Sequence, residues 1–338
     1  MPSYNLAMVG FGHVGRAFLR LLIAKETELR RKYDIRWRLT GVATRRVGWF
    51  ADADGFNPIA LLNGHWPAHG GNASQPRNVR EWLERAKADV FFEASSLAVE
   101  TGQPATEHLR AALENGAHAI SANKGPIVHA YRELTALAKE KGRQFLFEST
   151  VMDGVPIFSL FPLGLPATEL RGFQGVLNST TNVVLTEIEK GRSFSEAVQK
   201  AQSLGIAETD PTADLDGWDA AVKLVALAIV LMGADLKIEQ VQRTGIRDLS
   251  EEKIRSVRAA GMRYKLVCRV ERRGDGVQCS VQPELLLATD PLAGLEGTSS
   301  AVRFDLDMFG LSIVEHNPGI EATAYGLLAD FVRVAAAG

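Results

Sequence analysis

The feature that most constrains the fold is a glycine-rich turn near the N-terminus. Residues 10–15 are Gly-Phe-Gly-His-Val-Gly, and they directly follow an apolar run that ends at Val9. Apolar residues then recur at helical spacing from Val14 to Leu22. When a strand passes through such glycines into a helix, backbone N–H groups and the helix N-terminus face one point and stabilise phosphate charge there. The turn therefore predicts a dinucleotide-binding unit; the alternative is a purely structural glycine turn.

Strand and helix patterns alternate over the first 150 residues. We expect further strands over 37–44, 89–93 and 117–121, and helices over 79–87 and 104–115. Such alternation is typical of a parallel sheet that is covered by helices on both faces. The predicted fold class is therefore α/β, with a doubly wound Rossmann sheet at the start of the chain.

The sequence changes in character after residue 149, which predicts a second domain over residues 150–319. Segments 155–166 and 171–182 are rich in Pro, Gly and Thr, and we expect them to be extended. Helical patterns follow over 195–204 and 216–233. This domain is expected to be mixed α+β.

A β-hairpin is predicted near residue 275. Residues 264–271 and 277–281 have strand patterns and flank a loop that contains Asp275-Gly276. The last apolar helix, over 322–334, could pack on either domain by its pattern alone. We assign residues 320–338, together with 1–149, to the dinucleotide-binding domain.

Composition excludes several classes of protein. The 38 basic and 40 acidic residues leave a net charge of −2, which argues against a nucleic-acid or anionic-membrane partner. The longest apolar run, 224–234, is far shorter than the ~20 residues that cross a bilayer. Cys268 and Cys279 have no CxxC spacing, and the N-terminus lacks the features of a signal peptide. We therefore expect a cytoplasmic protein that acts on a small molecule.

The end of the second strand predicts the cofactor type. In dinucleotide-binding folds an acidic residue at this point binds the ribose of NAD, whereas arginine accommodates the 2′-phosphate of NADP. The sequence here is Thr44-Arg45-Arg46, with no carboxylate. Because guanidinium groups match phosphate in charge and geometry, we predict a preference for NADP(H) over NAD(H). The alternative is that both arginines form a solvated basic corner.

One lysine interrupts the most apolar helix of the chain. Lys223 lies within the helix that starts near Asp216, and Asp219 is one turn earlier on the same face. A buried ammonium needs a carboxylate partner or a wet cavity. The pair therefore predicts a cavity where a substrate gains or loses a proton; a structural ion pair is the alternative.

Two neighbouring features extend this prediction. The loop before the helix carries four carboxylates, which suit a ligand with an amino group: Glu208, Asp210, Asp214 and Asp216. Alternatively, Asp214 or Asp216 caps the helix. Lys124 follows the carboxyl end of a parallel strand, the edge where open sheets bind ligands, although lysines at such positions are commonly solvated.

Taken together, these segments resemble the homoserine dehydrogenase family over nearly the whole chain. The motifs that carry the resemblance are GFGHVG, SANKGPI, ESTVMDGVPIF, GVLNSTTNVVLTEI and AQSLGIAETDPTADLDGWDAAVKL. The resemblance implies a Rossmann domain plus a mixed catalytic and dimerisation domain, assembled as a homodimer. It also implies reversible, NAD(P)-dependent interconversion of L-homoserine and L-aspartate 4-semialdehyde, in threonine and methionine biosynthesis. The chain would be a short form without a C-terminal regulatory domain.

The resemblance also implies roles for individual residues. Lys223 would donate the proton to the substrate oxygen, with Lys124 as a second candidate. Asp219 and Glu208 would bind the hydroxyl and ammonium ends of the substrate, with Asp214 and Thr180 nearby. The cofactor would be bound by Gly10, Phe11, Gly12, His13, Val14, Gly15, Thr44, Arg45, Arg46, Ser95, Ser96, Lys124 and Gly319. A structural sodium or potassium ion would be held partly by the main-chain carbonyls of Glu148, Val151, Asp153 and Val155, with Gly205 and Glu208 also implicated.

The sequence departs from the family pattern at three points. Ile206 replaces a tyrosine, Ser179 replaces a glycine, and the late glycine turn over 315–319 keeps only Gly319 in place. These changes leave two alternatives: a related dehydrogenase that acts on another hydroxy amino acid, or a catalytically silent NADP(H)-binding regulatory protein. A catalytically silent protein is disfavoured because the chain contains all four candidate site residues, Lys223, Asp219, Glu208 and Lys124.

Overall fold

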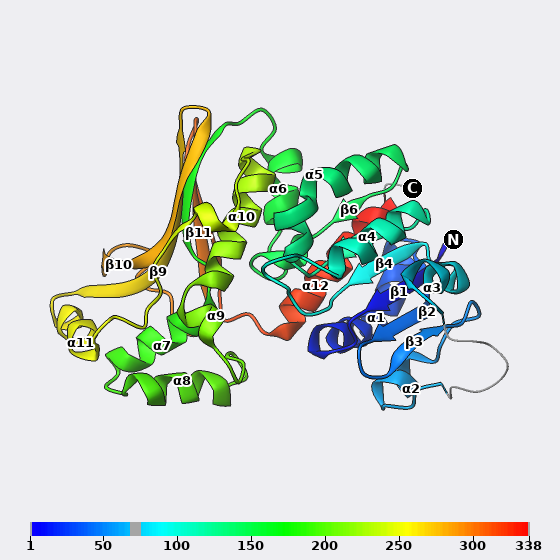
Figure 1. The fold of residues 1–338 in the computed structure, drawn as a ribbon, viewed down its shortest axis with the longest axis horizontal. Helices are drawn as coiled ribbons and strands as arrows, with labels where there is room; N and C mark the ends of the chain where they lie inside the picture. The colour runs from blue at the N-terminus through cyan, green and yellow to red at the C-terminus, as the bar shows by residue number, and fades with distance from the viewer. Residues whose placement is uncertain (1, 68–75, 337–338) are drawn as a thin grey trace. The chain divides into compact units, whose positions relative to one another are not determined.

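A computed structural model describes residues 2–67 and 76–336 of the chain (Figure 1). The chain divides into two compact units, one formed by residues 1–158 and 320–338 and the other by residues 159–319. Each unit contains one six-stranded sheet. The first unit extends to Phe158, a few residues past the domain boundary that the sequence suggested.

The sheet of the first unit has the strand order β3-β2-β1-β4-β5-β6. All neighbouring strands are parallel except β3, which pairs antiparallel with β2 at the edge. The strands are β1 (Ser3–Val9), β2 (Arg36–Thr44), β3 (Gly48–Ala51), β4 (Val90–Glu93), β5 (His118–Ser121) and β6 (Phe145–Leu146). The helices are α1 (His13–Lys32), α2 (Pro58–Leu62), α3 (Val79–Ala86), α4 (Ala105–Glu114), α5 (Gly125–Glu140) and α12 (Ile320–Ala336), with a 3₁₀ turn over Glu148–Thr150. The predicted α/β class with a mostly parallel sheet is confirmed.

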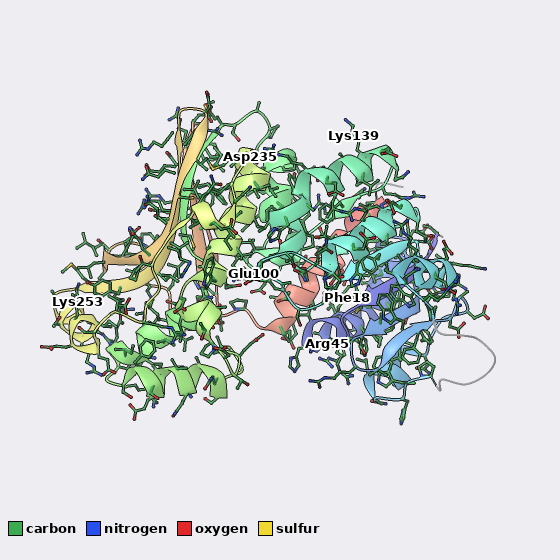
Figure 2. All side chains as sticks on the ribbon, viewed as in Figure 1. Phe18, Arg45, Glu100, Lys139, Asp235 and Lys253 are labelled. Atoms are coloured by element: carbon green, nitrogen blue, oxygen red, sulfur yellow. The ribbon has the colours of Figure 1, made fainter. Side chains whose placement is uncertain are left out.

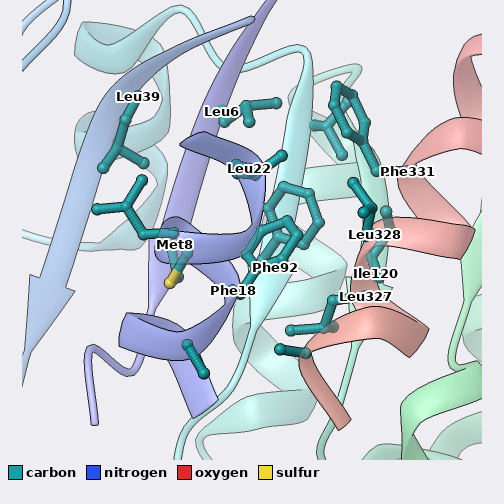
Figure 3. Close-up of a cluster of buried hydrophobic side chains, with 14 of the residues drawn as sticks. Leu6, Met8, Phe18, Leu22, Leu39, Phe92, Ile120, Leu327, Leu328 and Phe331 are labelled. Atoms are coloured by element: carbon teal, nitrogen blue, oxygen red, sulfur yellow. The ribbon is translucent and has the colours of Figure 1, made fainter. Parts of the chain in front are cut away.

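The core of the first unit shows why the last helix returns to it. Figure 3 shows α1 and α12 packed side by side, with their apolar faces meeting β1 and β4. Leu327 and Phe331 of α12 are fully buried in the same cluster as Phe18 of α1. The labelled members of the cluster are Leu6, Met8, Phe18, Leu22, Leu39, Phe92, Ile120, Leu327, Leu328 and Phe331. Residues from both ends of the chain therefore form one core.

The second unit is mixed, and its sheet has the order β12-β11-β7-β9-β10-β8. Neighbouring strands are antiparallel except β8 and β10. The predicted hairpin is present as β9 and β10, each longer than expected. The strands are β7 (Leu170–Val176), β8 (Gln242–Arg243), β9 (Met262–Arg273), β10 (Gly276–Leu287), β11 (Ser300–Leu306) and β12 (Gly310–Glu315). The helices are α7 (Ser179–Glu189), α8 (Phe194–Ser203), α9 (Thr212–Leu215), α10 (Trp218–Met232) and α11 (Glu251–Ala259), with a 3₁₀ turn over Ile238–Gln240.

Two segments that we expected to be extended are partly helical, although residues 171–176 of the second are extended in β7. Residues 157–164 form α6 (Ile157–Gly164), where Pro162 near the end of a short helix costs a single backbone bond. Helix α7 begins at Ser179, because the Asn178 side chain accepts a bond from the Thr181 N–H at 2.8 Å and caps the helix. We expected an extended chain up to residue 182, and the cap at Asn178 instead starts a helix there.

Helix α10 is the apolar helix that the sequence predicted. It is bounded by Gly217 and Gly233, which adopt left-handed conformations with φ of 82° and 64°. Most of its side chains between these glycines are buried. Among the described residues, no helix combines the length and apolarity that crossing a membrane requires.

Lys265 on β9 is a buried lysine outside the predicted site. Its side chain is 1% exposed, and its ammonium donates to Asn182 Oδ1 at 2.6 Å and to the Leu295 carbonyl. Burial lowers the pKa of Lys265 to about 8, although nearby Glu189 opposes this shift. In the unfolded chain a lysine keeps its ordinary pKa of 10.5.

This difference predicts how stability depends on pH. Between about pH 8 and 10.5 the unfolded chain binds the proton that native Lys265 has lost, so the free energy of unfolding should rise with pH. Denaturant unfolding of the parent and of Lys265→Met at pH 7.5 to 10.5 measures the free energy of unfolding at each pH. The rise with pH that is due to Lys265 should be absent from the variant. Exposed Lys253, replaced with methionine, is the control. Parallel curves for the parent and Lys265→Met would contradict the prediction.

Candidate active site

The glycine turn connects β1 to α1, and its three glycines have different roles. A Cβ on Gly10, whose φ is 93°, would lie 2.2 Å from the Ala94 carbonyl oxygen. A Cβ on Gly15 would lie 2.3 Å from the Gly10 carbonyl oxygen. In contrast, a Cβ on Gly12 would meet no atom within 4 Å. The fold itself therefore requires Gly10 and Gly15, whereas Gly12 borders open space where a ligand can approach the backbone.

The loop after β4 lies against this turn. The Ser95 N–H donates to Glu93 Oε1 at 2.8 Å, and the Asn123 amide donates to the carbonyls of Ser95 and Ser96, both at 3.2 Å. The Ser95 hydroxyl is buried and has no hydrogen-bond partner in the part of the chain that the structure describes. Because an unpaired buried hydroxyl is costly, a bound polar ligand is expected to satisfy it. The turn and this loop together fit a dinucleotide.

The remaining cofactor residues lie at the ends of other elements. Arg45 and Arg46 are exposed in the turn between β2 and β3, and Figure 2 marks Arg45. The Thr44 hydroxyl closes this turn by accepting from the Val47 N–H at 2.8 Å. Lys124 lies half-buried at the start of α5, a helix that the sequence did not predict. Gly319 is the last residue of the second unit.

In the second unit, Lys223 lies at the centre of a group of polar side chains. Its ammonium donates to the Leu177 carbonyl at 2.7 Å and is 3.1 Å from Asp219 Oδ2. The two side chains are 18% and 20% exposed, so the pair is neither sealed from solvent nor fully solvated. This confirms the predicted pairing across one helical turn, in a position where a small substrate could reach the ammonium.

Asp214 joins the pair through Asn178. The Asn178 amide donates to Asp214 Oδ1 at 2.7 Å and to Asp219 Oδ2 at 3.1 Å, and the Thr180 hydroxyl donates to Asp214 Oδ2 at 2.8 Å. Burial raises the pKa of Asp214, and the charge of Asp219 raises it further. Two carboxylates facing one ammonium favour a ligand that brings another positive charge. We refer to Asn178, Thr180, Asp214, Asp219 and Lys223 as the Lys223 cluster.

The structure does not bring all the predicted acidic residues together. Glu208 is exposed, in the turn that follows α8 and Gly205. Asp216 forms an ion pair with Arg247 at 2.5 Å. Neither Asp214 nor Asp216 caps α10, whose N-cap is Gly217 without a side-chain bond. The alternative in which one of them caps this helix is therefore wrong.

Sequence reasoning missed Asn178 and the Leu177 carbonyl. Both lie where β7 ends and α7 begins, far from Lys223 in sequence. The available signal was Asn followed by Ser-Thr-Thr, a pattern that is typical of a helix start and places a polar side chain beside the first turn.

The predicted cation residues fall in two groups. Glu148, Val151, Asp153 and Val155 lie in the first unit, where Met152 and Asp153 adopt left-handed conformations with φ of 55° and 51°. The Glu148 side chain is already engaged by the Phe158 N–H at 2.6 Å. Gly205 and Glu208 lie in the second unit. Within residues 2–67 and 76–336, no group of three or more His, Cys, Asp or Glu side chains could hold a metal ion.

Comparison with known proteins agrees with this geometry. The family model described as "Homoserine dehydrogenase" matches residues 156–332, and that described as "Homoserine dehydrogenase, NAD binding domain" matches residues 10–148. An NAD(+)-dependent homoserine dehydrogenase from Pseudomonas canavaninivorans is 36% identical, and the match covers 99% of this chain and 97% of that protein.

Solved structures show the same similarity. A homoserine dehydrogenase from Thiobacillus denitrificans has a TM-score of 0.84 and 29% identity, covering 99% of this chain and 74% of that one. A hyperthermophilic archaeal homoserine dehydrogenase in complex with NADPH has a TM-score of 0.80 and 27% identity, covering 98% of each chain. The nucleotide-binding turn, the Lys223 cluster and these matches lead to one conclusion: the chain belongs to the homoserine dehydrogenase family.

Proposed function

We propose that this enzyme interconverts L-aspartate 4-semialdehyde and L-homoserine, prefers NADP(H), and uses Lys223 as the proton donor during reduction. Family membership supports the reaction and a nicotinamide cofactor. The observation that carries the residue assignment is the Lys223 ammonium, held between the Leu177 carbonyl and Asp219. This position suits a general acid because the proton is presented from a fixed direction.

The Lys223 cluster would bind and protonate the substrate. The carboxylates of Asp214 and Asp219 would attract the substrate ammonium, and the Thr180 hydroxyl and Asn178 amide hold Asp214 in place. During reduction the Lys223 ammonium gives a proton to the aldehyde oxygen, whose C=O bond becomes a C–O single bond as hydride adds to carbon. In the reverse direction neutral Lys223 takes the hydroxyl proton. When bound, the nicotinamide supplies or accepts the hydride.

A direct assay tests the reaction. Reduction of aspartate 4-semialdehyde and oxidation of homoserine are followed by absorbance of the reduced cofactor, with other hydroxy amino acids as competing substrates. Homoserine is expected to have the highest kcat/KM. A higher value for another hydroxy amino acid would assign the enzyme a different substrate, and cofactor binding without turnover of any would favour a regulatory protein.

The cofactor preference rests on Arg45 and Arg46, which are exposed beyond β2. We expect the double variant Arg45→Ser/Arg46→Ser to raise KM for NADPH by about tenfold or more, because charge-assisted bonds to the 2′-phosphate are lost. KM for NADH should stay unchanged. Arg30→Ser/Arg31→Ser, at the far end of α1, is the matched control.

NAD(H) is the second candidate, because the Pseudomonas canavaninivorans relative is named NAD(+)-dependent. A lower KM for NADH than for NADPH in the parent enzyme would favour it. An unchanged ratio of the two KM values in Arg45→Ser/Arg46→Ser would remove these arginines from cofactor selection.

We also propose that a sodium or potassium ion binds the main-chain carbonyls around Glu148 to Val155. The residues fit such an ion in one respect: the left-handed turn at Met152 and Asp153 curves this segment, and carbonyl oxygens are the ligands that hard cations take. The ion would have a structural role, and no proton or hydride step depends on it.

A further inference from the structure

We propose that Asn178 is a positioning residue for the reaction, and that its amide keeps Asp214 ionised and holds the carboxylates of Asp214 and Asp219 in place beside Lys223. The inference rests on the proposed function and deepens it. Asn178 lies in the motif GVLNSTTNVVLTEI, but neither the roles that the resemblance implies nor the spacing of charges in α10 assigns a role to it. It follows from three observations: the orientation of the amide, its burial, and the two elements that meet at this point.

The orientation of the Asn178 amide is determined by its neighbours. Its oxygen accepts from the Thr181 N–H at 2.8 Å and from the Thr181 hydroxyl at 2.9 Å. A flipped amide would turn its NH₂ toward these two donors, so the oxygen must face α7. The NH₂ group consequently faces Asp214 and Asp219, one hydrogen to each.

Burial makes these two bonds strong. The Asn178 residue is 3% exposed, so water competes little for its amide. A carboxylate that accepts a hydrogen bond is stabilised in its charged form, which lowers its pKa. At Asp214 this effect opposes burial and the charge of Asp219, both of which raise the pKa. Without Asn178, therefore, protonation of Asp214 would become easier.

The neighbouring residue completes the arrangement. Leu177, directly before Asn178, accepts the Lys223 ammonium on its carbonyl at 2.7 Å. Two consecutive residues at the end of β7 thus hold the lysine and both carboxylates. Since the cap anchors Asn178 to α7, the positions of all three charged groups are tied to one helix start.

Substitutions can separate capping from donation to the carboxylates. Asn178→Asp keeps an oxygen for the Thr181 N–H, and a negative charge at a helix N-terminus is favourable, so α7 should form. It replaces the NH₂ donor with an oxygen that repels both carboxylates. Asn178→Ser also keeps a cap but loses both donations. Asn78 caps α3 by accepting from the Glu81 N–H at 3.0 Å, which makes Asn78→Asp the matched control in the other unit.

We expect Asn178→Ser to unfold near the denaturant midpoint of the parent, and Asn178→Asp to unfold at a lower midpoint because its carboxylate is buried beside two others. Both variants should lower kcat/KM for aspartate semialdehyde about 10²-fold or more. The acidic limb of the kcat/KM profile should move to higher pH, because the carboxylates have lost a donor. Asn78→Asp should leave kcat/KM and the acidic limb of its pH profile unchanged. An acidic limb that stays in place, with kcat/KM within threefold of the parent, would overturn the inference.

A titration that needs no turnover separates this inference from the proposed function. The side-chain carboxyl carbons of ¹³C-labelled aspartates are followed by NMR against pH, and Asp214→Asn identifies the Asp214 signal. A higher titration midpoint for Asp214 in Asn178→Ser supports the inference, whether or not the parent reduces the semialdehyde. A parent that does not reduce it would refute the proposed function but not the role of Asn178. An unchanged midpoint refutes the role of Asn178 even in an active enzyme.

Discussion

Replacing Lys223 with methionine is expected to lower kcat for aspartate semialdehyde reduction by about 10²- to 10⁴-fold, the usual contribution of a positioned general acid. Methionine fills a similar volume but has no proton to give, and the Asp219 carboxylate loses its ammonium partner. Binding of NADPH should be unaffected, because the glycine turn belongs to the other unit. Steady-state kinetics and a fluorescence titration of NADPH measure the two effects.

Lys253→Met, on α11 of the same unit, is the control and should retain full activity. If Lys223→Met keeps kcat within tenfold of the parent while Lys124→Met loses it, then Lys124 is the proton donor. Loss of NADPH binding in Lys223→Met would indicate a damaged fold rather than a missing acid.

The second large effect is expected from Gly12→Val. A Cβ at Gly12 would meet no protein atom within 4 Å, so we expect the variant to fold as the parent does. It would, however, occupy the space where a pyrophosphate approaches the backbone. Losing two charge-assisted hydrogen bonds costs about 3 kcal/mol or more, which corresponds to a Kd for NADPH raised about 10²-fold or more.

Gly10→Ala provides the contrast for this prediction. Its Cβ would overlap the Ala94 carbonyl, and its φ of 93° is unfavourable for alanine, so this variant should lose thermal stability before cofactor binding is considered. Normal NADPH affinity in Gly12→Val would show that the cofactor does not use this turn.

The sequence predicted those features that depend on local spacing. The turn at residues 10–15, the alternating elements before residue 150, and the pairing of Asp219 with Lys223 each arise from neighbouring residues. Helices α6 and α7 were missed because apolar, Thr and Pro residues suit both extended chain and short helices. For α7, the Asn178 cap decides in favour of the helix.

The part of the site that spacing could not predict is contributed by separate elements. Asn178 follows a sheet strand, Asp214 lies in α9 and Asp219 in α10, and only the folded chain brings both carboxylates within hydrogen-bond distance of the Asn178 amide. Glu208 shows the opposite case. It lies near the other carboxylates in sequence, yet its side chain is exposed beyond α8.

The return of α12 to the first unit has a consequence for biosynthesis of the protein. Leu327, Phe331 and Val334 fill the layer beside α1, so the part of this core that α12 covers stays exposed while residues 159–319 are being translated. The first unit therefore cannot complete its core until the whole sequence of the second unit has been synthesised. Chaperone demand on the nascent polypeptide should be greatest during that interval.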